Sequence, residues 1–187
     1  LAMVLEKYRQ AVEQKAIVSW EETSDYPSGR LTGEVTVAPV FDSQGGCTHL
    51  VGSVHDITER KRAESALRES KERFRTVANS APVMIWVSGP DNGGTFFNRA
   101  WLDFTGRTME EECGEGWISS VHPDDLDDCL RTCGASFDTR RAFQIEFRLR
   151  RADGQYRWIL DTGVPRYRHG EFVGFIGSCL DLTERKL

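Results

Sequence analysis

Long apolar runs are missing from this sequence of 187 residues. No stretch approaches the ~20 consecutive apolar residues that a membrane-spanning helix needs, so no such helix is predicted. Basic charge is also in deficit, with 24 Lys and Arg against 29 Asp and Glu, for a net charge of -5. A nucleic-acid-binding surface needs clustered positive charge and a high pI, so this balance argues against a nucleic-acid partner.

The cysteines have neither the number nor the spacing of a disulfide framework. Five is an odd count, and no regular spacing connects them. Reduced thiols in a cytosol-like compartment are therefore expected, and the chain is predicted to be cytoplasmic. With 39% hydrophobic and 28% charged residues, the composition is that of a globular protein.

What the sequence does contain is an internal repeat. The segment LVGSVHDITERK at 50–61 returns as FIGSCLDLTERK at 175–186, an offset of 125 residues. A repeat of this length indicates a duplicated domain, because solenoid repeats are only roughly 20–50 residues long. The first copy already ends near residue 58, so it is expected to be the C-terminal half of a domain. The chain itself is then expected to be a piece of a longer protein.

The first 58 residues are predicted to form one helix and three strands. Apolar residues at helical spacing cover 1–15. Three strand-like runs follow, separated by glycine-containing turns, at 16–23, 31–41 and 48–56. Pro39 predicts a bulge or strand end, because proline cannot donate to a strand ladder. The last strand is expected to have an unpaired edge, covered by another chain or by the second domain.

A highly charged helix is predicted over 58–79. It carries a short heptad seam of Ala63, Leu67, Ser70, Phe74 and Val77. Two interpretations remain open: a solvated connector helix, or a two-stranded coiled coil that makes a homodimer. The seam spans barely two heptads, whereas a sustained coiled-coil pattern needs about three or four.

The remainder of the chain predicts an α+β domain. Two strands, 82–88 and 95–98, flank an Asp-Asn-Gly-Gly turn. Helices are expected at 99–104, 109–112 and 123–137. Pro123 suits the first turn of the longest helix, and Asp124 and Asp125 complement its dipole. Three strands complete the domain, at 141–151, 156–167 and 171–181; in the first of these, apolar and polar residues alternate.

This order of elements resembles the PAS sensory domain family. Three motifs strengthen the resemblance: FNRAWLDFTG at 97–106, HPDD at 122–125 and DLTERK at 181–186. It covers 74–186 in full and 1–61 as the C-terminal half of another copy. It implies a five-stranded antiparallel sheet with helices on one face, enclosing a small cavity. A partial PAS domain and a connector helix precede it. The implied divisions are 1–58, 59–79, 80–183 and, as the start of an exit helix, 184–187.

The resemblance also implies a function. PAS domains usually sit in tandem upstream of a bacterial histidine kinase or diguanylate cyclase. The chain is therefore expected to be a non-enzymatic module that senses a small ligand or redox cue. It would pass the signal through the exit helix to a C-terminal output domain. The alternative is a ligand-free unit for dimerisation and relay. Thr58 and Thr183 are expected to cap the two signalling helices with their hydroxyls.

The pattern and the resemblance together predict which residues line the cavity. They are Ile85, Phe97, Trp101, Phe104, Phe147, Trp158 and Cys179. Trp86, Trp101, Trp117 and Trp158 could stack on a planar ligand, although large aromatics more often fill a core.

Known cofactor motifs of the family are absent. Haem-binding members place an axial His on the long helix, but 123–139 contains none. Light-sensing flavin members carry Gly-x-Asn-Cys-Arg-Phe, which the sequence around Cys113 does not match. Neither a haem of that kind nor a photoreactive flavin is predicted, and the sequence identifies no other cofactor.

Cys113, His122, Cys129 and Cys133 lie within about twenty residues of each other and could supply four metal ligands. Only Cys129 and Cys133 approach the spacing of structural zinc ligands. Burial of the thiols as small hydrophobes and helix capping by His122 explain these residues better. Neither a metal site nor an acid–base centre at 122–125 is predicted.

Overall fold

The computed structural model describes residues 2–27 and 29–186. Leu1 and Leu187, which belong to the first and last predicted helices, lie outside this range. The chain divides into two compact units, 1–71 and 72–187, so the division falls within the predicted connector helix. Among the described residues, no helix is both long and apolar enough to cross a membrane.

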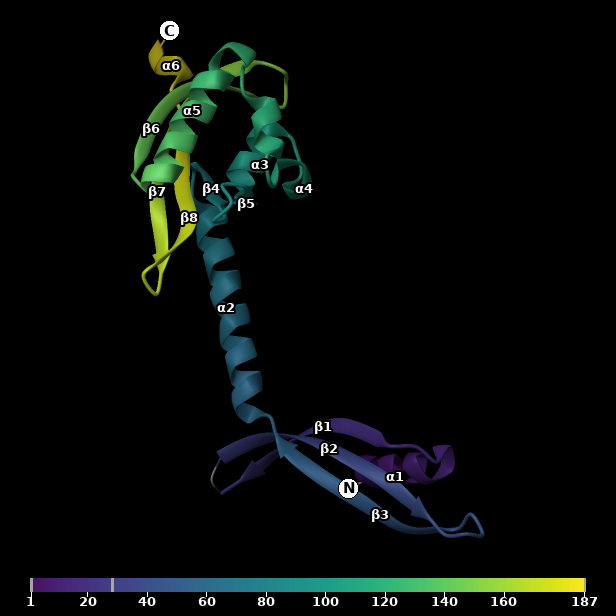
Figure 1. Cartoon of the computed structure of the whole chain (residues 1–187). Helices are drawn as coiled ribbons and strands as arrows, with labels where there is room; N and C mark the ends of the chain where they lie inside the picture. The colour runs from purple at the N-terminus through teal and green to yellow at the C-terminus, as the bar shows by residue number, and fades with distance from the viewer. Residues whose placement is uncertain (1, 28, 187) are drawn as a thin grey trace. The chain divides into compact units, whose positions relative to one another are not determined.

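The first unit packs one helix on a three-stranded antiparallel sheet (Figure 1). Helix α1 spans Ala2–Gln14. The strands follow in the order β1-β2-β3, with bounds Val18–Tyr26, Gly29–Phe41 and Cys47–Asp56. Ala11 of the helix is buried against Val18 and Val37 of the sheet. The predicted helix and three-stranded meander are confirmed.

The last strand of this unit has an unpaired edge. In the described part of the chain, β3 pairs only with β2, and all ten of its residues are exposed. The covering of this edge by another chain or by the second domain stays a prediction. Pro39 lies where β2 has a strand on one side only, because pairing with β1 ends at Val37. The expected irregularity lies next to it, as a register shift between Val40 and Phe41.

Helix α2 spans Thr58–Ser80 and confirms the predicted helix. Leu67 and Val77 of the heptad seam are 57% and 64% exposed. Phe74 is different, because its ring lies 5.2 Å from the ring of Phe96 within the second unit. Part of the seam therefore already has a partner inside the chain.

The second unit is a five-stranded antiparallel sheet with helices on one face (Figure 1). The strand order is β5-β4-β8-β7-β6. The strands are β4 Met84–Ser88, β5 Gly94–Phe97, β6 Phe143–Arg150, β7 Tyr156–Arg168 and β8 Glu171–Asp181. The helices are α3 Arg99–Thr105, α4 Met109–Glu112, the 3-10 helix η1 Gly116–Ser120, α5 Pro123–Thr139 and α6 Thr183–Lys186.

Local sequence signals explain these elements. Asn92, in the turn between β4 and β5, adopts a positive φ of 65°, as a tight hairpin turn of this kind requires. Pro123 opens α5, and His122 caps it by accepting the N–H of Asp124. Phe147 and Leu149 of β6 are buried in the core. The predicted α+β fold is confirmed, and η1 is an addition that the sequence pattern did not predict.

The prediction that the hydroxyls of Thr58 and Thr183 cap the signalling helices was wrong. The N–H of Thr183 is accepted by the carboxylate of Asp181, at 2.8 Å. The Thr183 hydroxyl instead accepts the N–H of Trp158 on β7, at 3.0 Å. The first copy repeats the arrangement with Thr58, Asp56 and Thr32. The threonine therefore ties the start of each helix to a neighbouring strand, and the aspartate acts as the cap.

Candidate ligand-binding site

A row of residues across the second sheet forms the floor of a pocket. Strand pairing aligns one residue from each strand: Phe97, Trp86, Gly177, Gly163 and Phe143. A Cβ on Gly177 would lie 2.4 Å from the Trp86 indole, and one on Gly163 would lie 2.3 Å from the Phe143 ring. The glycines thus leave a trough in which the two rings stack, 6.1 Å apart and 27° from parallel.

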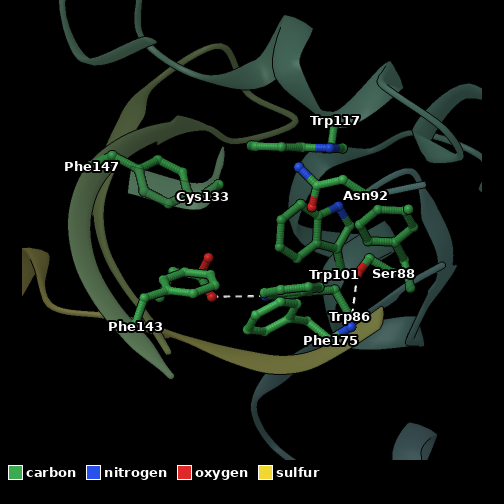
Figure 2. Close-up of a pocket in the computed structure, with 12 residues that line it drawn as sticks. Trp86, Ser88, Asn92, Trp101, Trp117, Cys133, Phe143, Phe147 and Phe175 are labelled. Atoms are coloured by element: carbon green, nitrogen blue, oxygen red, sulfur yellow. Dashed lines mark hydrogen bonds between the residues drawn. The ribbon is translucent and has the colours of Figure 1, made fainter. Parts of the chain in front are cut away.

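Aromatic rings also form the walls of the pocket. The ring of Trp117, from η1, lies across the cavity from Trp86, with Trp101 and Phe147 at the sides (Figure 2). The centre of a water-sized sphere can move through about 40 Å³. That is room for about three waters, since each needs ~10–15 Å³. The full lining is Trp86, Ser88, Asn92, Gly94, Phe97, Trp101, Trp117, Cys133, Phe143, Phe147, Asp161 and Phe175.

Asp161 is the acidic residue of the lining. Its side chain comes from β7, and the residue is only 6% exposed. Oδ1 accepts hydrogen bonds from Trp86 Nε1 at 2.7 Å and from Cys179 Sγ at 3.2 Å. Desolvation by burial raises the pKa of Asp161 to about 6, against the lowering effect of these two hydrogen bonds. At neutral pH the pocket therefore contains a buried negative charge.

The thiols near the pocket are in an unreactive environment. Burial and the neighbouring Asp161 raise the pKa of Cys179 well above its usual value. A hydrogen bond with Cys133, followed by burial, raises the pKa of Cys129. Because the thiolate is the form that reacts with oxidants, these groups are poor sensors of a redox cue.

The residues weighed as metal ligands do not form a site. Cys129 and Cys133 lie together on α5, whereas Cys113 ends α4. His122 uses Nδ1 to cap α5, and its ring packs edge-on against Tyr156. No cluster of three potential metal ligands occurs in residues 2–27 and 29–186.

Asn98 connects the pocket to helix α2. It follows the floor residue Phe97 in sequence and is completely buried. Its Oδ1 accepts the N–H groups of Ile85 and Trp101, at 2.9 and 3.1 Å. Its Nδ2 donates to the carbonyls of Ala78 and Val83, at 2.8 and 2.9 Å. One amide thus joins α2, β4 and the start of α3.

A buried ion pair holds the wall that carries Trp117. Arg107 Nε lies 3.1 Å from Glu112 Oε1, and Glu112 has no exposed surface. The guanidinium also donates to the Ser119 hydroxyl and to the carbonyl of Glu111, at 2.5 and 2.6 Å. Since these groups surround η1, Arg107 positions the loop from which the Trp117 ring projects.

Only some of the predicted cavity residues line the pocket. Phe97, Trp101 and Phe147 line the pocket. Cys179 lies behind the lining, hydrogen-bonded to Asp161. Phe104 packs against the core cluster, outside the lining.

Ile85 and Trp158 are corrections, because neither is among the lining residues. Trp86, one position after Ile85, and Asp161, three positions after Trp158, do line the pocket. Successive side chains point to opposite faces of a strand, so residues an odd number of positions apart face opposite sides. Both predicted residues therefore face away from the cavity. Trp158 instead packs under the guanidinium of Arg148, 5.4 Å from the ring centre.

Asp161 and the two glycines of the trough are not among the predicted cavity residues. A usable signal for Asp161 was present: it is the acidic residue at an inward position of β7, between the buried Ile159 and Gly163. Trp86 and Trp117 were considered only as possible stacking groups.

Comparison with known proteins agrees with this architecture. One model of the PAS fold matches residues 95–179, and a second matches residues 2–62. The chain belongs to the PAS family. The crystal structure of a PAS domain from Colwellia psychrerythraea superposes with a TM-score of 0.53 at 20% identity, covering 61% of this chain and 98% of that one. At this identity the likeness shows the fold alone.

Two relatives place PAS sequence of this kind within longer proteins. The uncharacterized protein y4lL of Sinorhizobium fredii is 43% identical over 143 residues, covering 76% of this chain and 17% of the relative. The peroxide stress-activated histidine kinase mak1 of Schizosaccharomyces pombe is 27% identical over 165 residues, covering 80% and 10%. The chain thus spans less than a fifth of either relative.

Proposed function

We propose that this PAS chain is the sensory module of a signal-transduction protein, with a histidine kinase as its output. A small molecule in the aromatic pocket would change how the sheet holds exit helix α6. The proposal is supported most directly by the way strands β7 and β8 connect Asp161 in the pocket to the start of the exit helix. Trp158, whose N–H is bound by Thr183, lies three positions before Asp161 on β7. Cys179, which donates to Asp161, lies two positions before Asp181 on β8.

The free energy that a ligand must supply to shift the exit helix is small. A ligand can shift the exit helix only by binding its two states with different affinity. A tenfold preference corresponds to about 1.4 kcal/mol. Loss of a hydrogen bond such as that between Thr183 and Trp158 is of the same order, about 0.5–1.5 kcal/mol.

Filling the pocket is expected to alter the exit helix. In Cys133→Phe the new ring occupies the cavity from α5, and we expect amide exchange across 178–186 to change at least threefold. Hydrogen–deuterium exchange with mass spectrometry measures this, and Cys133→Met provides a smaller filler. The control is Ala135→Phe, on the exposed side of the same helix. Unchanged amide exchange in both Cys133 variants would contradict the proposed coupling between the pocket and the exit helix.

A homodimer is the second proposal, and exposed apolar groups support it. Leu67 and Val77 of α2 are open to solvent, and the edge of β3 lacks a partner strand within the described residues. An unpaired edge invites pairing with another chain. A dimer of this kind would also serve the alternative function, that of a ligand-free relay unit.

Leu67→Glu is expected to weaken such a dimer at least tenfold, because it places charge in an apolar seam. Sedimentation velocity over a range of concentrations measures the dissociation constant. Ala66→Glu, at the next exposed position of α2, adds the same charge outside the seam and should leave association unchanged. Phe74 is a poorer choice, since its ring also contacts Phe96. Equal dissociation constants for Leu67→Glu and the unmodified chain would exclude this seam.

A further inference from the structure

Asp161 is a buried carboxylate that has no positive partner among the described residues. Trp86 and Cys179 both donate to its Oδ1, and Oδ2 accepts no hydrogen bond from the part of the chain that the structure describes. Within that same part, no Lys, Arg or His pairs with it, and no basic group contributes to its electrostatic environment. Buried charges in proteins are as a rule paired. The missing charge is one that a ligand can supply.

The surroundings of this carboxylate suit an organic cation. Indole and phenyl rings enclose the cavity, among them Trp86, Trp101 and Trp117 (Figure 2). The face of an indole carries negative potential and attracts alkylammonium groups. A bare metal ion would instead need several carboxylate, thiolate or imidazole ligands, and the described residues form no such cluster.

The rim of the pocket is polar. The exposed Asn92 lies at the rim of the pocket, where a substituent can reach solvent.

We propose that the pocket binds a small alkylammonium ion, with Asp161 as its counter-charge and the tryptophans as an aromatic cage. This inference rests on the proposed ligand-sensing function and names the chemical class of its ligand. The space of about three waters fits a compact ammonium head and excludes a fused-ring cofactor in this conformation.

Choline and its neutral isostere 3,3-dimethylbutan-1-ol test the proposal, because they share shape and hydroxyl but differ in charge. Calorimetric titration of the full chain, with tryptophan fluorescence as a second readout, should give at least tenfold tighter binding of choline. In Asp161→Asn, which keeps the Oδ1 acceptor, the preference should fall to within about twofold. Asp153→Asn, in the exposed turn before β7, should retain the tenfold preference.

The pH dependence is a further readout. Choline affinity should fall as the pH is lowered through about 6, since the pKa of Asp161 is raised to that value and the protonated carboxyl has no charge to offer. The neighbouring titratable groups are the thiols Cys179 on β8 and Cys129 and Cys133 on α5. Burial raises the pKa of Cys179, and the hydrogen bond with Cys133 together with burial raises the pKa of Cys129, so these two thiols stay neutral over this pH range. Binding of the neutral isostere should not change over this range.

Three outcomes overturn the proposal: equal binding of the two probes, an unchanged preference in Asp161→Asn, or no binding of choline. If Asp161→Asn does not fold, Trp117→Leu serves instead, and removal of this cage wall should weaken choline binding at least fivefold. The exchange experiment with Cys133→Phe uses no ligand. A failed choline titration beside altered exchange would therefore reject the ligand class and keep the sensory function.

Discussion

Asn98→Ala is expected to lower the free energy of unfolding of the second unit by about 4 kcal/mol. The substitution leaves the N–H groups of Ile85 and Trp101 and the carbonyls of Ala78 and Val83 without their partner. Each buried polar group left unsatisfied costs about 1–3 kcal/mol, although relaxation and water recover part of this. Urea unfolding followed by tryptophan fluorescence measures the loss.

Asn79→Ala is the matched control for this experiment. Asn79 also uses its side-chain amide to accept a backbone N–H, that of Arg99 at 2.8 Å, but it is exposed. Water can replace it, so the expected loss is below about 1 kcal/mol. If the two variants unfold at the same urea concentration, the Asn98 amide is not the junction between α2 and the pocket that its contacts describe.

Arg107→Met is expected to destabilise the second unit by about 3 kcal/mol and to loosen the Trp117 wall. The change leaves the completely buried Glu112 side chain without its partner, and removal of one member of a buried pair typically costs ~3–5 kcal/mol. It also removes the donors to Ser119 and to the carbonyl of Glu111. Chemical denaturation measures stability, and acrylamide quenching of tryptophan fluorescence reports the opening of the wall.

Two further variants separate charge burial from general effects of the substitution. Arg99→Met removes an arginine from an exposed ion pair with Asp103, and such pairs contribute little. Arg107→Met combined with Glu112→Leu removes both charges and should recover part of the lost stability. A double variant as unstable as Arg107→Met alone would locate the loss in the hydrogen bonds of Arg107 rather than in its charge.

Whether a predicted residue lines the cavity depends on the face of its strand from which its side chain projects. Phe97, Trp101 and Phe147 were placed on the side where the pocket lies. Ile85 lies one position and Trp158 three positions from a lining residue of the same strand, and side chains an odd number of positions apart point to opposite faces. The choice between Ile85 and Trp86 is not encoded in local composition, because both side chains are large and apolar.

The helix caps show a related limit. Asp, Thr and Glu at a helix start predict a cap, and a cap is present in both copies. The threonine hydroxyl could serve its own helix or a neighbouring strand. Only the proximity of Trp158 and Thr32 in the folded sheets decides for the strand.

By itself, the sequence determined the duplicated organisation, the order of helices and strands, and the PAS fold. These depend on local signals: the repeated DITERK and DLTERK segments, the alternation along β6, and the proline that opens α5. Tertiary structure alone decided the pocket. Gly177, Gly163, Trp86 and Phe143 come from four strands, and only sheet pairing aligns them into a trough. The same pairing buries Asp161 beside them, because long-range register, not local pattern, determines which side chains share a cavity.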